Sequence, residues 1–191
     1  RGGYGRKLPA SLGEGEVFSA CGAAMLIDKA LFEDLGGFDE RFFCYCEDVD
    51  LGYRLRLTGR MTLLLPEARV AHVGSASTGV RSEFAIFHGS RNRVWTFLKN
   101  TPPLLLWLTT PLHVAVTAAL LLLHLRRGDA GPAVRGIGAA LKTADLDAVL
   151  ADRKAVQAGR KVGSGAILRV MSIDPAAFIG RRFVIRKIRP S

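Results

Sequence analysis

Residues 22–59, GAAMLIDKALFEDLGGFDERFFCYCEDVDLGYRLRLTG, carry most of the information on fold and chemistry in this sequence. An apolar run over residues 17–27, with small residues at its centre, is short enough to predict a buried strand. Asp28 is a suitable cap for a short helix over residues 29–35, and the glycine pair that follows should end this helix. The stretch therefore predicts a strand followed by a short helix.

A second helix begins after an aromatic connection, residues 38–46, and runs from an acidic first turn to near Gly59. Acidic residues are favoured in a first turn by the helix dipole. Asp48 shares its face with three positions at three- and four-residue spacing: Leu51, Leu55 and Thr58. Asp48 is therefore expected where the buried stripe meets a cleft, whereas Asp50 points elsewhere and should form a surface pair with Arg54.

Further along the chain, residues 61–65 and 69–73 are predicted as two short strands on either side of Pro66. A polar loop over residues 74–82 follows them. The spacing of apolar residues then predicts an amphipathic helix over residues 83–100, which a Pro-Pro pair interrupts.

Charge divides the chain into three parts. Residues 1–101 hold 13 Lys/Arg and 12 Asp/Glu, residues 102–125 hold neither, and residues 126–191 hold 14 Lys/Arg and 5 Asp/Glu. We therefore expect a nearly neutral domain, an apolar segment and a basic tail that carries one helix over residues 133–151. A basic tail suits anionic lipid or nucleic acid, and the adjacent apolar segment favours lipid.

The cysteines and the first residue give weaker information. Cys21, Cys44 and Cys46 form neither an even disulfide set nor a paired zinc motif, so we expect reduced thiols in the cytosol. The sequence begins at Arg1 without a signal-peptide pattern, and we interpret it as a fragment.

Four pieces of the sequence, in this order, resemble the C-terminal half of family 2 glycosyltransferases, in particular rhamnosyltransferase-like members. They are the small-residue strand at residues 22–24, the GGFDE turn at residues 36–40, the pair Glu47-Asp48, and His72 in LLLPEARVAH. The resemblance covers roughly residues 17–100. No single piece is specific, but their order and spacing together are.

The resemblance implies part of a GT-A fold, an α/β architecture with a mixed sheet and flanking helices. The half outside this sequence would hold the nucleotide-binding units and an Asp-x-Asp metal motif. In such enzymes the Asp of the Glu-Asp pair, here Asp48, is the base that deprotonates the acceptor hydroxyl, and the transfer inverts the anomeric carbon. From the residues alone, acids that simply occupy a helix N-terminus are an equally ordinary interpretation of this cluster.

The same resemblance makes His72 a ligand of the divalent metal that bridges the donor diphosphate. An imidazole ligand favours Mn²⁺ over Mg²⁺. The Asp-x-Asp motif would complete the site, so this fragment should bind metal weakly. A lone histidine is otherwise more often structural.

Six further residues are candidates for substrate binding: Gly22, Ala23, Glu47, Phe43, Tyr45 and Arg81. The first two would let the backbone approach the donor sugar, although tight strand packing explains small residues equally well. Glu47 suits an acceptor hydroxyl, and the two aromatic rings suit stacking on a sugar or anchoring of the connection in the core. Arg81 belongs to a loop that resembles a lid over the donor. Arg91 and Asn92 repeat a family pattern in the following helix. Arg91 is added as a binding candidate, with a solvated helix face as the alternative for both residues.

Residues 104–125 are long and apolar enough to span a bilayer. A single span from a cytosolic domain would place the basic tail outside, against the positive-inside tendency. We therefore favour a monotopic pair of helices bent at Pro111, with the tail on anionic headgroups. A true span and a helix buried in protein remain open alternatives.

Together these features predict an inverting glycosyltransferase at the cytoplasmic face of a bacterial membrane. It would use a nucleotide-sugar donor and a lipid-linked or polysaccharide acceptor in cell-envelope glycan synthesis, and this fragment alone should be inactive. The first alternative is a non-catalytic membrane-associated module. The second is a nucleic-acid binder, which the scarcity of aromatic residues in the tail argues against.

Overall fold

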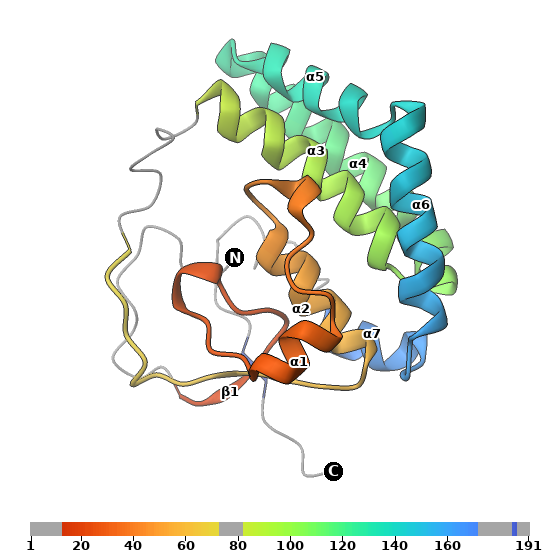
Figure 1. Cartoon of the computed structure of the whole chain (residues 1–191). Coiled ribbons are helices and arrows are strands. Elements are labelled where there is room, and N and C mark those ends of the chain that lie inside the picture. Colours follow the sequence, from red (N-terminus) through yellow and green to blue (C-terminus); the bar gives the residue numbers. More distant parts are fainter. Residues whose placement is uncertain (1–12, 73–81, 172–184, 187–191) are drawn as a thin grey trace.

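The computed structural model describes residues 13–72, 82–171 and 185–186, which form a stack of helices beside a small sheet (Figure 1). The strands and 3₁₀ turns are β1 (Gly15–Val17), η1 (Gly22–Ala24), η2 (Glu40–Phe42) and β2 (Thr62–Leu64). The helices are α1 (Lys29–Asp34), α2 (Glu47–Leu57), α3 (Glu83–Asn100), α4 (Pro103–Arg127), α5 (Ala130–Ala140), α6 (Thr143–Ala158) and α7 (Ser164–Val170).

The short helix after Asp28 is confirmed as α1. The Asp28 carboxylate accepts a hydrogen bond from the backbone N–H of Leu31 at 2.9 Å, a cap that contributes about 1 kcal/mol. Gly36 and Gly37 follow the helix with φ of +78° and +63°. Glycine adopts this left-handed region without strain, so the glycine pair ends the helix as predicted.

The strand predicted over residues 17–27 is wrong. Only Val17 belongs to a strand, β1, which pairs antiparallel with β2; the chain then turns through η1, and Leu26 is fully exposed. A buried strand needs neighbours at its edges and cover on both faces. Among the described residues β1 has β2 and one bridge to Arg186. The mixed sheet is therefore not formed by this part of the chain, which folds as helices with a two-stranded antiparallel sheet.

Of the two strands predicted around Pro66, the first is confirmed as β2 and the second is wrong for residues 69–72, while residue 73 lies outside the described part. A turn precedes an irregular stretch there: the Ala68 N–H donates to the Leu65 carbonyl at 3.1 Å, and the Arg69 N–H donates to the Glu67 carbonyl at 2.9 Å. These local bonds take up backbone groups that a strand would offer to a neighbour.

Helix α3 matches the predicted amphipathic helix and forms the centre of the helical stack, with α2, α5 and α6 packed around it and α4 in contact with it through side chains (Figure 1). Ser82 caps it by accepting from the Ala85 N–H at 3.2 Å. Helix α4 returns antiparallel along it. The rings of Phe97 and His113 stack at 4.0 Å, and Arg93 Nη2 donates to Thr117 Oγ1 at 3.4 Å. Between these two contacts the residue number falls by four on α3 and rises by four on α4, as expected for two antiparallel helices.

The basic tail contains three helices in its described part, not the single helix predicted over residues 133–151. The chain turns between α5 and α6, at Leu141 and Lys142. Ending α5 there frees the Ala140 carbonyl, which accepts a hydrogen bond from the buried Trp95 Nε1 at 3.1 Å. The turn is thus set by a tertiary contact with α3, which the local sequence of the tail does not reveal.

The expected pair of membrane helices bent at Pro111 is wrong in one respect, because α4 is one continuous helix. Proline removes a backbone donor and crowds the carbonyl four residues earlier. The hydroxyls of Thr109 and Thr110 bond to the carbonyls of Leu105 and Leu106, at 2.6 and 2.5 Å, beside this position. In the described part of the chain α4 is the one helix long and apolar enough to cross a membrane.

Two apolar clusters hold the layers together. The first joins the aromatic connection to α3, α5 and α6 through Phe42, Val94, Trp95, Ala140 and Val149. The second joins α2, α4 and α7 through Tyr53, Leu57, Leu105 and Ile167. The tail helices therefore complete the core beneath α2 and α3.

A buried polar network connects α2 to α3. Asp50, with no exposed surface, accepts from Arg54 Nε at 2.9 Å, from Lys99 Nζ at 3.1 Å and from Asn100 Nδ2 at 2.7 Å. The prediction that Asp50 and Arg54 form a surface pair is wrong: they pair, but inside the protein. Buried charges persist when they are compensated and hydrogen-bonded, as here.

The network extends to the GGFDE turn. Arg54 donates to the carbonyls of Leu35 and Gly37, and Lys99 Nζ donates to Asp39 at 2.7 Å. Burial raises the pKa of Asp39, but hydrogen bonds from Arg41 and Lys99 outweigh burial and hold that pKa well below its ordinary value. Asp39 therefore stays ionised, and α1, α2 and α3 meet at one set of paired charges.

The substitution Lys99→Met tests this network. It leaves Asp39 and Asp50 without their shared cation in a buried site, so the free energy of unfolding should fall by about 3–5 kcal/mol, measured by urea denaturation. Lys29→Met is the matched control, because Lys29 pairs with Glu33 at 3.7 Å on the surface and should cost less than about 0.5 kcal/mol. Equal small losses would contradict the assignment of Lys99 to the buried network.

Candidate active site

Asp48 lies in the first turn of α2 with a side chain only 2% exposed. Its Oδ2 accepts from the backbone N–H of Gly22 at 3.0 Å, and its Oδ1 accepts from the N–H of Val49 at 2.8 Å. Each oxygen of a carboxylate can accept more than one hydrogen bond. The two backbone donors therefore fix the direction of the carboxylate.

Three of the predicted site residues come together at this point. A Cβ added to Gly22 would lie 3.6 Å from the Asp48 Cβ and 4.0 Å from Glu47 Oε1. Gly22 and Ala23 belong to the exposed turn η1. Tight packing within a strand is therefore not the reason that these residues are small. Their small size leaves space beside the carboxylates of Glu47 and Asp48.

The connection before α2 has an unusual backbone. Phe43, Tyr45 and Cys46 have φ of +57°, +70° and +67°, although none is glycine. Each such residue costs about 1 kcal/mol or more, and this conformation persists only where surrounding contacts enforce it. Cys46 is the N-cap of α2, so the strained segment determines where the helix and its acidic first turn begin.

Asn92 of α3 supplies those contacts. Its side chain is fully buried, and Nδ2 donates to the carbonyls of Phe42, Cys44 and Tyr45, each at 2.8 Å. One amide group thus holds three carbonyls of the connection in place.

Arg91, predicted to bind substrate, lies against the same connection. Its Nη2 donates to the Arg41 carbonyl at 2.9 Å and to the Phe42 carbonyl at 3.3 Å. Its guanidinium also lies over the Trp95 ring, 4.3 Å from the centroid. These contacts differ from the solvated helix face that was the alternative, and they support the backbone beside the candidate site.

The two aromatic candidates, Phe43 and Tyr45, join an aromatic cluster on α3. Phe43 is 76% exposed and lies 6.0 Å from the ring of Phe84 and 5.9 Å from that of His88. Tyr45 lies 6.3 Å from Phe84. Burial and the positive charge of Arg91 both lower the pKa of His88, so its imidazole is neutral at physiological pH. The connection therefore presents an uncharged aromatic surface just before Asp48.

The metal-binding part of the expected site is not assembled by the described residues. His72 is exposed, and the described ranges contain no group of three His, Cys, Asp or Glu side chains that could hold a metal ion. These residues do not fit a metal centre by themselves. Arg81 and residues 74–81 of the predicted lid lie outside the described part of the chain.

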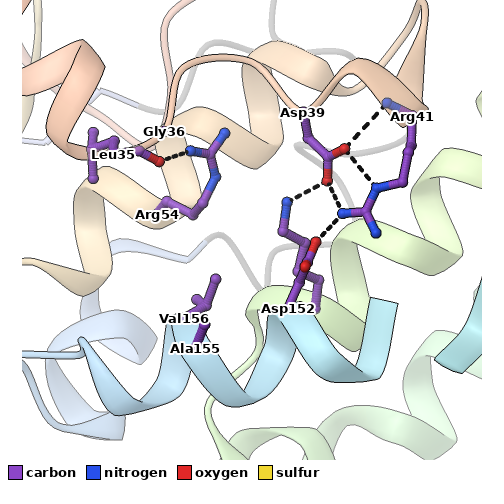
Figure 2. A pocket seen from close by; sticks show the side chains of 9 residues that line it. Leu35, Gly36, Asp39, Arg41, Arg54, Asp152, Ala155 and Val156 are labelled. Atoms are coloured by element: carbon purple, nitrogen blue, oxygen red, sulfur yellow. Dashed lines mark hydrogen bonds and ion pairs between the residues drawn. The ribbon is translucent and has the colours of Figure 1, made fainter. Parts of the chain in front are cut away.

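A pocket of about 300 Å³ lies elsewhere, between α1, α2, α3 and α6 (Figure 2). Figure 2 shows Arg41 between Asp39 and Asp152, and both of these are ion pairs. Lys99 and Arg54 also line the pocket. Its lining charges pair with one another or with Asp50, and Asp48 is not among its lining residues, so it is part of the structural network, not the candidate active site.

Comparison with known proteins assigns this region to a family. The sequence model described as "Glycosyltransferase like family 2" matches residues 6–94. Those residues, a little under half of the chain, are therefore similar to glycosyltransferase family 2. The family resemblance predicted from four short pieces of sequence is thus confirmed.

The curated relatives of this family 2 segment are similar over a short region. An N-acetylglucosaminyl-diphospho-decaprenol L-rhamnosyltransferase of Mycobacterium tuberculosis is 47% identical over 58 residues, which are 30% of this chain and 19% of that protein. The O-antigen biosynthesis protein RfbC of Myxococcus xanthus is 43% identical over 61 residues, 32% of this chain and 4% of that protein. The chain therefore spans about a fifth or less of the length of these relatives. No solved structure matches it significantly.

The family 2 segment contains Gly22, Asp48 and Asn92, but it ends before Lys99 and before the helices α4 to α7. The family pattern included Asn92 without a definite role and with a solvated helix face as the alternative, whereas Asn92 is buried and holds the strained connection. The signal available was a buried position on the inner face of an amphipathic helix occupied by an amide, a residue that needs several hydrogen-bond partners there.

The substitution Asn92→Asp tests this clamp. It places a carboxylate oxygen against three carbonyls, so the free energy of unfolding should fall by about 3 kcal/mol at neutral pH. The loss relative to wild type should be smaller near pH 4, roughly the ordinary pKa of aspartate, because a protonated carboxyl can again donate one bond.

Gln157→Glu is the control for that experiment, since the Gln157 amide donates to a single carbonyl, that of Asn100, at 2.9 Å. It should lose less stability than Asn92→Asp. Urea denaturation at both pH values measures the two differences, and equal, pH-independent losses would contradict the clamp.

Proposed function

We propose that this chain forms the acceptor-side part of an inverting glycosyltransferase. The observation that carries the proposal is the buried Asp48 carboxylate, aimed by the Gly22 N–H at the start of α2 within a family 2 segment. In the complete protein, we propose, this part completes a GT-A domain (residues 1–101 here), followed by the apolar segment (102–125) and the basic tail (126–191).

The proposed reaction moves a sugar from a nucleotide-diphosphate donor to an acceptor hydroxyl. The acceptor oxygen forms a bond to the anomeric carbon as the bond from that carbon to the diphosphate breaks, and the diphosphate leaves with the electron pair. Asp48 takes the hydroxyl proton. A sugar hydroxyl is a very weak acid, so a positioned base is needed during the attack. Attack opposite the leaving group inverts the anomeric configuration.

The residues around Asp48 have proposed supporting roles. Gly22 and Ala23 leave room for the donor sugar, and Glu47 accepts a hydrogen bond from an acceptor hydroxyl. Phe43 and Tyr45 offer aromatic faces for sugar stacking. Arg81 is proposed to contact the donor phosphates, and Arg91, held on the connection, is proposed to position that surface.

The acceptor class is proposed from the relatives. The mycobacterial protein is named for a sugar-diphospho-decaprenol, a lipid-linked substrate, and the Myxococcus protein for O-antigen biosynthesis. We therefore propose a lipid-linked or polysaccharide acceptor in bacterial cell-envelope glycan synthesis, at the cytoplasmic face of the membrane. The apolar helix α4 and the basic tail support that location.

Asp48→Asn in the complete protein tests the proposed base. Transfer should fall by a factor of about 10² or more, because the amide cannot take the proton, while donor binding should stay within about twofold of wild type. Transfer is measured with labelled nucleotide sugar and donor binding by calorimetry.

Asp34→Asn is the matched control for the base, since Asp34 is an exposed residue at the end of α1. Its transfer rate should equal that of wild type. If Asp48→Asn lost donor binding together with transfer, or kept its transfer rate, Asp48 would not be the base.

The described residues do not assemble a metal site by themselves. His72 remains a predicted ligand of Mn²⁺ or Mg²⁺ beside an Asp-x-Asp motif elsewhere in the complete protein. His72→Ala should then weaken Mn²⁺ binding to the complete protein about tenfold or more, measured by calorimetric titration.

The control is His124→Ala, because His124 pairs with Asp129 at the far end of α4. It should leave the titration unchanged. An unchanged titration for His72→Ala would remove His72 from the ligands without affecting the role of Asp48.

A further inference from the structure

Helix α4 has an outer face without charge. From Leu104 to Leu125, the exposed residues are apolar except Thr110, and Trp107 is 84% exposed. The large exposed side chains on this helix are Leu104, Trp107, Leu108, Leu112, Val114, Leu122, Leu123 and Leu125. Soluble proteins rarely expose a continuous apolar surface of this extent.

The inner face of α4 carries its remaining polar side chains. His113 stacks on Phe97, Thr117 accepts from Arg93, and Thr109 bonds to the Leu105 carbonyl. This is the reverse of an ordinary surface helix, whose polar residues face water and whose apolar residues face the core. The outer face therefore fits an apolar surrounding.

We propose that α4 lies flat in the interface of a lipid bilayer, with its outer face among the acyl chains, and does not cross the membrane. The length of the helix alone would permit a crossing, since 25 residues extend about 37 Å, more than the roughly 30 Å of a hydrocarbon core. The packing of the helix decides between the two arrangements.

A crossing α4 would carry α3 into the bilayer, because two side chains of α3 contact α4 in antiparallel register. Arg93 meets α4 at Thr117, near the middle of that helix, and an arginine at the bilayer centre costs about 3 kcal/mol or more. The charges of Asp50 and Lys99, on the other side of α3, would follow it. An in-plane helix keeps all of these groups on the aqueous side.

The features at the ends of the apolar face favour lipid over a second protein copy. Trp107 suits the membrane interface, where indole rings concentrate. Arg126 and Arg127 are exposed directly after the last apolar residue, and residues 126–191 carry an excess of nine positive charges. Such a basic region beside an apolar helix face matches anionic headgroups.

The orientation also places the candidate active site, a consequence that rests on the proposed function. Arg93 and Phe97 point from α3 toward α4, whereas Asn92 points to the connection before Asp48. Helix α3 thus separates the site from the lipid face, and neighbouring helix axes lie about 8–10 Å apart. A hydroxyl carried above the membrane on a polar linker, such as a sugar on a lipid diphosphate, suits that height.

Tryptophan depth in vesicles tests the proposal. The vesicles contain phosphatidylglycerol and phosphatidylcholine, with bromine placed either near the headgroup or near the chain end. Native Trp107 is compared with Trp107→Phe/Ala115→Trp and Trp107→Phe/Leu122→Trp, which move the indole along the exposed face. Trp107→Phe alone gives the background of the buried Trp95.

An in-plane helix predicts that shallow bromine quenches all three positions more strongly than deep bromine, with the same ratio. Stronger quenching by deep bromine at position 115 than at 107 and 122 would show a crossing helix and overturn the proposal. So would the absence of quenching at all three, and sedimentation of a dimer would then identify a second copy as the cover. Asp48→Asn should leave the quenching unchanged, so this test and the test of the transferase fail independently.

Discussion

The buried carboxylate of Asp50 is the point on which the arrangement of the helices depends. It accepts hydrogen bonds from Arg54 in its own helix and from Lys99 and Asn100 in α3. Arg54 in turn holds the carbonyls at the end of α1, and Lys99 also binds Asp39. An apolar contact tolerates sliding, whereas a fully paired buried charge has one register in which every partner is satisfied. The network therefore fixes how α1, α2 and α3 meet.

The strained connection before α2 is the second constraint, and it depends on the first. Three residues with positive φ are costly, and Asn92 compensates by binding three carbonyls of the connection. Asn92 is on α3, so it reaches these carbonyls only where the charge network holds α3 against α2. Asn92 therefore contacts the connection before α2, while Lys99 and Asn100, further along α3, contact Asp50 in α2. The first turn of α2 is therefore held by Asn92 through the connection before it and by the charge network through Asp50.

Local signals in the sequence predicted the elements that local interactions build. The Asp28 cap, the glycine pair after α1 and the apolar spacing of α3 each gave an element with nearly correct bounds. The errors share another cause. The run at residues 17–27 has the composition of a buried strand, but in the described chain only β2 and one bridge to Arg186 pair with β1, so it forms no long strand. The end of α5 depends on a bond from Trp95 in a different helix. Asp50 and Arg54 have the spacing of a surface pair, and only the position of Lys99 shows them to be buried. For the candidate site, Gly22, Glu47 and Asp48 were predicted together and lie together, while the clamp by Asn92 required the fold.

Of the two aspartates in the acidic turn, Asp50 has a structural role and Asp48 is the proposed base. Residues two apart on a helix point about 200° away from each other, so Asp48 and Asp50 face opposite sides of α2. Asp50 faces α3 and is held by three donors, whereas Asp48 faces η1 and the Gly22 N–H. Because the helix is rigid, fixing the direction of Asp50 fixes that of Asp48 as well. A base attached to a mobile loop would need to be ordered at each turnover, whereas the buried pairing two residues away already orders the proposed base, Asp48.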